Sequence, residues 1–117
     1  MKRYWVDTVH NTNYSLDMYQ LDAIHTAIYP KEKALEYCLL QLAAEAGECA
    51  GKLGKSIRKG EPFDVKDMLK ELGDVLWYIA NAAHTLDYNL SEVAKMNILK
   101  LRDRAERGVI NGDGDNR

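Results

Sequence analysis

Hydrophobic and polar positions follow a helical repeat of three and four residues in four segments of the chain, and turn residues separate the segments. The segments cover about residues 16–28, 33–58, 65–86 and 92–107. The expected N-terminal caps are Ser15, Asp64 and Ser91, and the breaks lie at Pro30, Lys59–Pro62 ("KGEP"), Asn89 and Gly108. No segment shows the strict alternation that is typical of a β-strand. The pattern therefore predicts an all-α fold, a bundle of four to five helices.

The 33–58 segment has two opposite stripes when its residues are placed at 100° intervals around a helix. One stripe is apolar and is the expected core face: Leu39, Leu42, Ala43, Ala46, Cys49, Ala50, Leu53 and Ile57. The other stripe is polar: Gln41, Glu45, Glu48, Lys52, Lys55 and Lys59. Taken alone, the polar stripe indicates a solvated face with helix-spaced Glu–Lys pairs.

The 65–86 segment is apolar over more than half of its circumference, which predicts that other helices surround it. A narrow polar stripe remains, formed by Asp67, Glu71, Asp74 and Tyr78. Unpaired carboxylates in such a place are costly, and a bound cation would remove the cost. If the two segments are antiparallel neighbours, Glu45 and Glu48 face Glu71 and Asp74. Four oxygen ligands suit Mg²⁺ or Mn²⁺, so these carboxylates are the candidate metal ligands and catalytic residues.

The 92–107 segment carries polar residues within its apolar stripe. Asn97 lies in the middle of that stripe, and Lys100 and Arg104 follow on or beside the same face. Long basic side chains can simply extend to solvent from such positions, but an inward Asn needs hydrogen-bond partners. Beside a metal site these side chains suit a phosphate or the edge of a base. Lys52 and Lys55 are further candidates for phosphate contact because of where their charge lies.

Three motifs follow one another in the chain: "EAGECAGK" (Glu45–Lys52), "ELGDVLWY" (Glu71–Tyr78) and "NILKLRDR" (Asn97–Arg104). Together they resemble the ExxE…ExxD signature, followed by NxxKLxxR, of the MazG-type nucleotide pyrophosphohydrolases in the all-α NTP pyrophosphatase superfamily. The stretch "YQLDAIHTAIYP" (Tyr19–Pro30) and the terminal "GDGDNR" also resemble small single-domain members of this family, many of them from phages and bacteria.

The resemblance implies one MazG-like domain over residues 1–117, with an N-terminal extension at 1–14 and a C-terminal loop or tail at 108–117. It implies hydrolysis of a nucleoside triphosphate, usually a dNTP, between the α- and β-phosphates, which yields the monophosphate and pyrophosphate. The implied metal is Mg²⁺, with Mn²⁺ as a substitute, and the implied assembly is a homodimer or tetramer in which the helices pack further.

Carried over residue by residue, the resemblance makes Glu45, Glu48, Glu71 and Asp74 the metal ligands. It makes Asn97 and Lys100 substrate contacts, with Arg104, Asn116 and Arg117 as further candidates. Some relatives carry an extra acidic residue just before the first motif Glu, where this chain has Ala44. The water is then activated by one of the four ligands or as a metal-bound hydroxide. Trp77 and Tyr78 suit a core, a subunit interface or stacking on a nucleobase.

Charge and composition narrow the remaining classes. A net charge of −2 argues against binding to a nucleic-acid backbone. No apolar run is long enough for a signal peptide or a membrane span, and two cysteines about 16 Å apart on one helix are expected to stay reduced. These features favour the cytoplasm, or the host cytoplasm for a phage protein.

Two other functions stay open from the sequence. One is a non-catalytic nucleotide- or metal-binding protein, or a helical assembly protein, with a degenerate MazG site. The other lies within the enzyme class, because hydrolysis of dUTP, dUDP or phosphoribosyl-ATP uses related helices and the same metal chemistry. A di-iron bundle would use Glu-x-x-His pairs, and the sequence has none.

Overall fold

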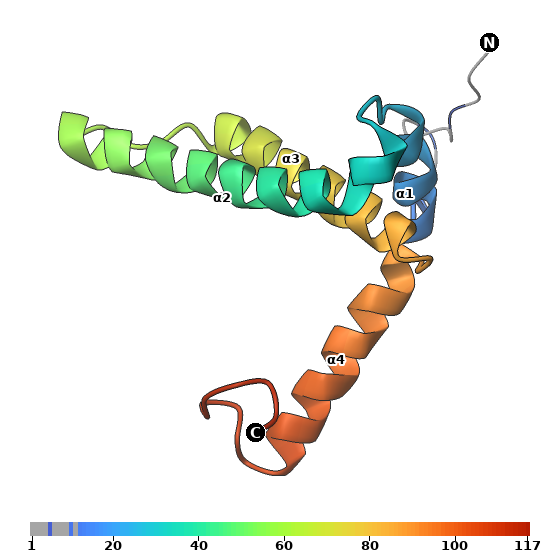
Figure 1. Cartoon of the computed structure of the whole chain (residues 1–117). Coiled ribbons are helices and arrows are strands. Elements are labelled where there is room, and N and C mark those ends of the chain that lie inside the picture. The colour runs from blue at the N-terminus through green and yellow to red at the C-terminus, as the bar shows by residue number, and fades with distance from the viewer. Residues whose placement is uncertain (1–4, 6–9, 11) are drawn as a thin grey trace.

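The computed structural model describes Trp5, His10 and residues 12–117, so most of the expected N-terminal extension lies outside the described residues. Four α-helices follow one another: α1 (Leu16–His25), α2 (Ala34–Lys59), α3 (Val65–Thr85) and α4 (Leu90–Glu106), with a short 3₁₀ turn, η1 (Lys31–Lys33), before α2 (Figure 1). The described part of the chain contains no strand, which confirms the all-α prediction. None of the described helices is long and apolar enough to cross a membrane.

Local side-chain chemistry explains where the helices begin and end. The Ser15 hydroxyl accepts a hydrogen bond from the Met18 amide at 3.1 Å, and the Asp64 carboxylate accepts one from the Asp67 amide at 3.2 Å. Each bond satisfies a donor that the first turn of a helix leaves unpaired. Gly60 ends α2 in the left-handed conformation with φ 67°, which a glycine adopts without strain.

Two boundaries differ by more than one residue from the sequence-based expectation. Helix α1 ends at His25, three residues earlier than predicted. Helix α4 is capped by Asn89 and begins at Leu90, so the prediction of Ser91 as its cap was wrong. The Glu92 carboxylate accepts a 2.7 Å hydrogen bond from the Asn89 amide, while the Ser91 hydroxyl is bonded to Asp17 of α1. A tertiary contact therefore uses the hydroxyl that the local pattern assigned to capping.

Helices α2 and α3 run antiparallel side by side, α1 packs across the end of α3, and α4 projects away from the pair (Figure 1). Helices α2 and α4 are described throughout, and within them no residue of α4 contacts α2. The radius of gyration is 17.2 Å, against about 13 Å for a compact domain of this length. The single chain is therefore an open arrangement with a small core.

A buried glutamine of α1, Gln20, binds the main chain where α3 ends and α4 begins. The Gln20 amide group donates to the carbonyls of Ala80 and Tyr88, each at 3.1 Å, and its oxygen accepts from the Leu90 amide at 3.0 Å. Gln20 is 5% exposed, so these bonds are shielded from water. The apolar core around it contains Ala23, Ala80 and Leu90, with Tyr19, Leu76, Trp77 and Ile79 packed against it.

The expected core stripe of α2 does not lie in the core of this chain. Leu39 is 50% exposed, Leu53 44% and Ile57 74%. Of the predicted stripe only Leu42 and Cys49 are partly buried, and the other buried or partly buried positions of α2 are Ala34, Leu35, Cys38, Gln41, Glu45, Lys52 and Ser56. Helix α2 therefore turns the edge that carries Glu45 and Lys52 toward α3, and most of its apolar stripe faces outward.

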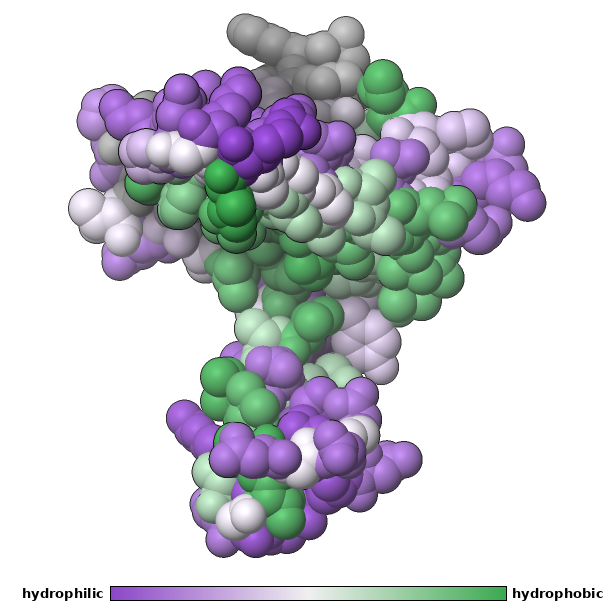
Figure 2. Space-filling model, turned by 90° about the vertical axis from the view of Figure 1, so that its left-hand side faces the viewer, coloured by the Kyte–Doolittle hydropathy of each residue, from purple (hydrophilic) through white to green (hydrophobic). Residues whose placement is uncertain are grey.

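Helix α3 differs from the prediction in the same way. Its apolar residues were expected to be surrounded by other helices, but Leu69 is 59% exposed and Leu72 is 50% exposed. Figure 2 shows hydrophobic residues gathered on the side of the α2–α3 pair that faces the α4 arm, and others on the arm itself. The single chain supplies too few helices to cover these apolar faces.

The contact between Asp17 and Ser91 predicts a pH dependence of stability. The Asp17 carboxylate accepts from the Ser91 amide at 2.9 Å and from its hydroxyl at 2.6 Å, and these bonds hold the pKa of Asp17 below its ordinary value of 3.8. A lowered folded-state pKa stabilises the fold above pH 3.8, and the contribution is lost as pH falls through the folded-state pKa. We expect the difference in melting temperature between wild type and Asp17→Asn to be constant from pH 5 to 7 and to shrink below about pH 4. A difference that stays constant down to pH 3 would contradict this linkage.

Candidate metal and phosphate site

Three carboxylates from α2 and α3 converge on one side of the helix pair. One oxygen of each of Glu45, Glu71 and Asp74 lies within 4.8 Å of the others, and Glu45 and Glu71 are partly buried while Asp74 is exposed. Glu71 and Asp74 are one helical turn apart on α3, so they share a face toward Glu45. Glu45 and Asp74 also line a pocket of about 280 Å³ together with Trp77 and Tyr78. The group therefore opens onto a cavity that a small ligand can enter.

The electrostatics of this group fit a cation. Burial raises the pKa of Glu45, and the charges of Asp74, Glu71 and Glu48 raise it further, as does a hydrogen bond with Glu71. The surroundings of Glu45 therefore disfavour its negative charge, and a bound cation would offset this repulsion. Since every donor in the group is a carboxylate oxygen, the set suits a hard divalent cation rather than a soft metal.

Glu48 lies beside this group rather than in it. Its side chain is exposed on α2, three residues after Glu45. It is close enough for its charge to raise the pKa of Glu45. The structure thus brings together three of the four predicted metal ligands and places the fourth at their edge.

Lys52 is paired with the carboxylates of α3. Its ammonium lies 2.6 Å from an Asp67 oxygen and 2.8 Å from a Glu71 oxygen. Asp67 belongs to the polar stripe but was not singled out from the sequence; its position four residues before Glu71, on the same face, is the signal that could have found it. Lys55, the other predicted phosphate contact on α2, is exposed.

Aromatic side chains border the carboxylates. The Trp77 and Tyr78 rings meet edge to face with centroids 4.8 Å apart, and the Trp77 ring N–H donates to the Thr26 hydroxyl at 2.7 Å. Burial and a hydrogen bond with Tyr37 raise the pKa of Tyr78 to about 12, so this hydroxyl stays protonated at neutral pH. Trp77 therefore ties α3 to the end of α1 and at the same time forms a wall of the pocket.

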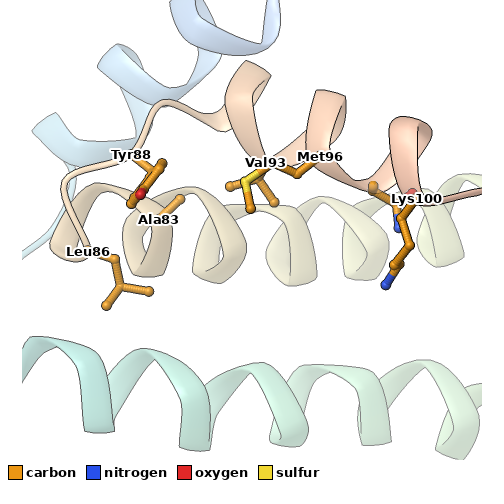
Figure 3. Close-up of a pocket in the computed structure, with 7 residues that line it drawn as sticks. Ala83, Leu86, Tyr88, Val93, Met96 and Lys100 are labelled. Carbon is orange, nitrogen blue, oxygen red and sulfur yellow. The ribbon is translucent and has the colours of Figure 1, made fainter. Parts of the chain in front are cut away.

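The predicted substrate contacts of α4 lie in a different place. Asn97 and Lys100 line a groove of about 610 Å³ between the end of α3 and α4. Figure 3 shows Lys100 on α4 and Ala83 on α3 in this groove. The other residues that line this groove are Ala83, Leu86, Tyr88, Val93 and Met96, so it is mostly apolar. Within one chain, Asn97 and Lys100 are not neighbours of the carboxylates on α2 and α3.

The C-terminal tail is folded against α4 of its own chain. The Arg117 guanidinium donates to the main-chain carbonyls of Val109, Ile110 and Gly114. A side chain at Gly112 would place its Cβ 2.6 Å from the Arg117 Cδ, so any larger residue there would displace the Arg117 side chain. Asn116 is exposed.

Asp115 connects the tail to the basic residues of α4. Its carboxylate accepts from Arg104 at 3.0 Å and from Lys100 at 3.2 Å, and the Arg104 and Lys100 bonds lower its pKa. Arg104 is only 4% exposed and also donates to the Asp115 main-chain oxygen. The Arg104 guanidinium therefore holds the tail, while Lys100 keeps an exposed end beside the groove.

Comparison with known proteins identifies the family of this chain. The model of the MazG nucleotide pyrophosphohydrolase domain matches residues 33–109. The chain belongs to the MazG nucleotide pyrophosphohydrolase family. It is also 43% identical over 112 residues to the Gene 37 protein of Mycobacterium phage L5, an alignment that covers 87% of this chain and 98% of the phage protein. No solved structure matches the chain.

Membership places the candidate site inside the family domain. The matched residues 33–109 include the carboxylates of α2 and α3 and the polar residues of α4, and they leave out α1 and the last eight residues. The MazG domain therefore contains the whole acidic group, while the tail that binds Lys100 and Arg104 lies beyond it.

Proposed function

We propose that this MazG protein hydrolyses nucleoside triphosphates, dNTPs in particular, between the α- and β-phosphates in a reaction that depends on Mg²⁺ or Mn²⁺. The convergence of Glu45, Glu71 and Asp74 beside a pocket is the observation that carries the proposal. A divalent cation bound there supplies Lewis-acid activation of a phosphate and of a water molecule. We expect the reaction to run in the cytoplasm, where nucleoside triphosphates are available.

The protein's own residues then bind and orient the substrate. Glu45, Glu71 and Asp74 hold the cation, and Glu48 adds negative charge at the edge of the group. Trp77 and Tyr78 form the apolar wall of the pocket, against which a base or sugar can lie. Phosphoryl transfer needs charge neutralisation and positioning more than covalent catalysis. An acidic group that holds a cation, together with basic side chains that contact the phosphates, can provide both.

The basic contacts come, in this proposal, from a second copy of the chain. Asn97 and Lys100 lie on the α4 arm, away from the carboxylates of the same chain, and apolar residues of all the long helices are exposed. The exposed set includes Leu53, Ile57, Leu69, Leu72, Met96 and Leu99. A homo-oligomer in which the α4 arm of one chain packs on the α2–α3 pair of another would cover these faces and complete each site. The positive charge of Lys100 complements the acidic group.

A substrate panel tests the proposed reaction. Purified protein is incubated with each canonical dNTP and NTP and with dUTP, with and without Mg²⁺ or Mn²⁺, and monophosphate and pyrophosphate are quantified separately. We expect metal-dependent release of both products in equal amounts. Release of orthophosphate instead would point to another bond, and no turnover by well-folded protein would favour a binding or assembly protein with a degenerate site.

A further inference from the structure

Lys52 binds the acidic group from within the protein. Its ammonium contacts Asp67 at 2.6 Å and Glu71 at 2.8 Å, and its side chain is 27% exposed while that of Glu71 is 17% exposed. A lysine ammonium is positively charged at neutral pH, and here two carboxylates hold it in place. The acidic stripe of α3 therefore contains a permanent cation.

Lys52 shares one carboxylate with the candidate metal group, as a second metal ion would. Glu71 belongs both to the group of three carboxylates and to the Lys52 pair, and Asp67 lies on the far side of Lys52, one turn earlier on α3. In enzymes with two metal ions, the ions lie about 3.5–4 Å apart. The Lys52 ammonium has one carboxylate in common with the metal group and one of its own, which is the ligand pattern expected of a second cation.

We propose that the Lys52 ammonium takes the place of a second divalent cation, so that each acidic group holds one metal ion. Lys52 is then a positioning residue that fixes Glu71 and neutralises Asp67, and its place is with the metal group instead of the substrate phosphates. The five carboxylates on the facing edges of α2 and α3 are Glu45, Glu48, Asp67, Glu71 and Asp74, and Lys52 is the cation that bonds to two of them. This inference rests on the proposed metal-dependent function.

Metal stoichiometry tests the inference without an activity assay. Mn²⁺ is titrated into full-length protein, and free Mn²⁺ is measured by electron paramagnetic resonance. We expect one Mn²⁺ per chain for wild type and two for Lys52→Met, which keeps an unbranched side chain one atom shorter and removes its charge. Circular dichroism checks the fold, and Lys52→Gln, which keeps a hydrogen-bond donor, replaces Lys52→Met if that variant unfolds.

Two matched variants assign the second ion. Lys55→Met makes the same change at an exposed position on the same helix and is expected to leave one Mn²⁺ per chain. Lys52→Met combined with Asp67→Asn removes the second ion's own carboxylate and is expected to return the count from two to one.

The outcomes separate this inference from the proposed function. Two Mn²⁺ per chain in wild type, or one in the folded Lys52 variant, overturns the inference, and metal-dependent turnover in the same preparation would leave the function standing. Wild type that binds no Mn²⁺ overturns both.

Discussion

Glu71→Gln is expected to lower metal-dependent turnover by about 1,000-fold, because a metal ion contributes several kcal/mol of transition-state stabilisation and each 1.36 kcal/mol is tenfold in rate. Glu71 lies at the centre of the site: it belongs to the three-carboxylate group and also binds Lys52. The amide keeps the size of the side chain and removes its charge. Turnover is measured as pyrophosphate release at saturating Mg²⁺, and metal binding by Mn²⁺ titration, so that a loss of metal affinity is separated from a loss of rate.

The matched control for this substitution is Glu61→Gln. Glu61 is exposed in the turn between α2 and α3. Its substitution makes the same chemical change away from the carboxylate group. We expect its turnover to stay within about twofold of wild type, as is usual for a surface substitution. If Glu71→Gln retained more than a tenth of wild-type turnover, the acidic group would not be the catalytic centre.

Glu71→Gln also tests whether the site is shared between chains. Glu71→Gln and Lys100→Ala are each expected to be weakly active alone, and an unfolded and refolded mixture contains mixed oligomers. If α4 of one chain serves the acidic group of another, each mixed pair has one site with both defects and one site with neither. Activity then returns to roughly a quarter of wild type for random dimers. A mixture no more active than its parts would show that each site is built within one chain.

Gln20→Leu is expected to destabilise the fold by about 3 kcal/mol, because it removes three hydrogen bonds, two of them buried and one partly buried, that contribute about 1 kcal/mol each. The leucine has a similar volume but leaves the carbonyls of Ala80 and Tyr88 and the amide of Leu90 without their partner. These three groups lie at the end of α3 and the start of α4. The free energy of unfolding is measured by urea denaturation at one fixed protein concentration, since the stability of an oligomer depends on concentration.

Gln41→Leu is the control for the loss of a glutamine. It makes the same chemical change at a half-buried position on α2, and we expect a change in the free energy of unfolding below about 1 kcal/mol. The two variants differ in what they do to α4: only Gln20→Leu frees the joint that sets the direction of the arm. Equal effects of the two substitutions would mean that Gln20 acts as an ordinary buried side chain.

The sequence by itself determined the helices and the chemistry of the site. Apolar spacing, Pro30 and the caps Ser15 and Asp64 predict elements whose bounds agree with the structure within one to three residues, because helix signals act within a few positions of the chain. Glu71 and Asp74 were recognisable for the same reason. Their spacing of three places them on one helix face whatever surrounds it.

Tertiary structure decided which face each helix buries and which residues meet. The apolar stripe of α2, read as core, lies largely outside because the edge with Glu45 and Lys52 turns toward α3. Ser91 bonds to Asp17 rather than capping α4, and Asp115 reaches Lys100 and Arg104 across a turn. Spacing along a chain defines the faces of a helix but not its rotation against a neighbour, which depends on how the helices pack together. That is why the sequence identified the carboxylates, while only the fold separated them from the α4 residues of the same chain.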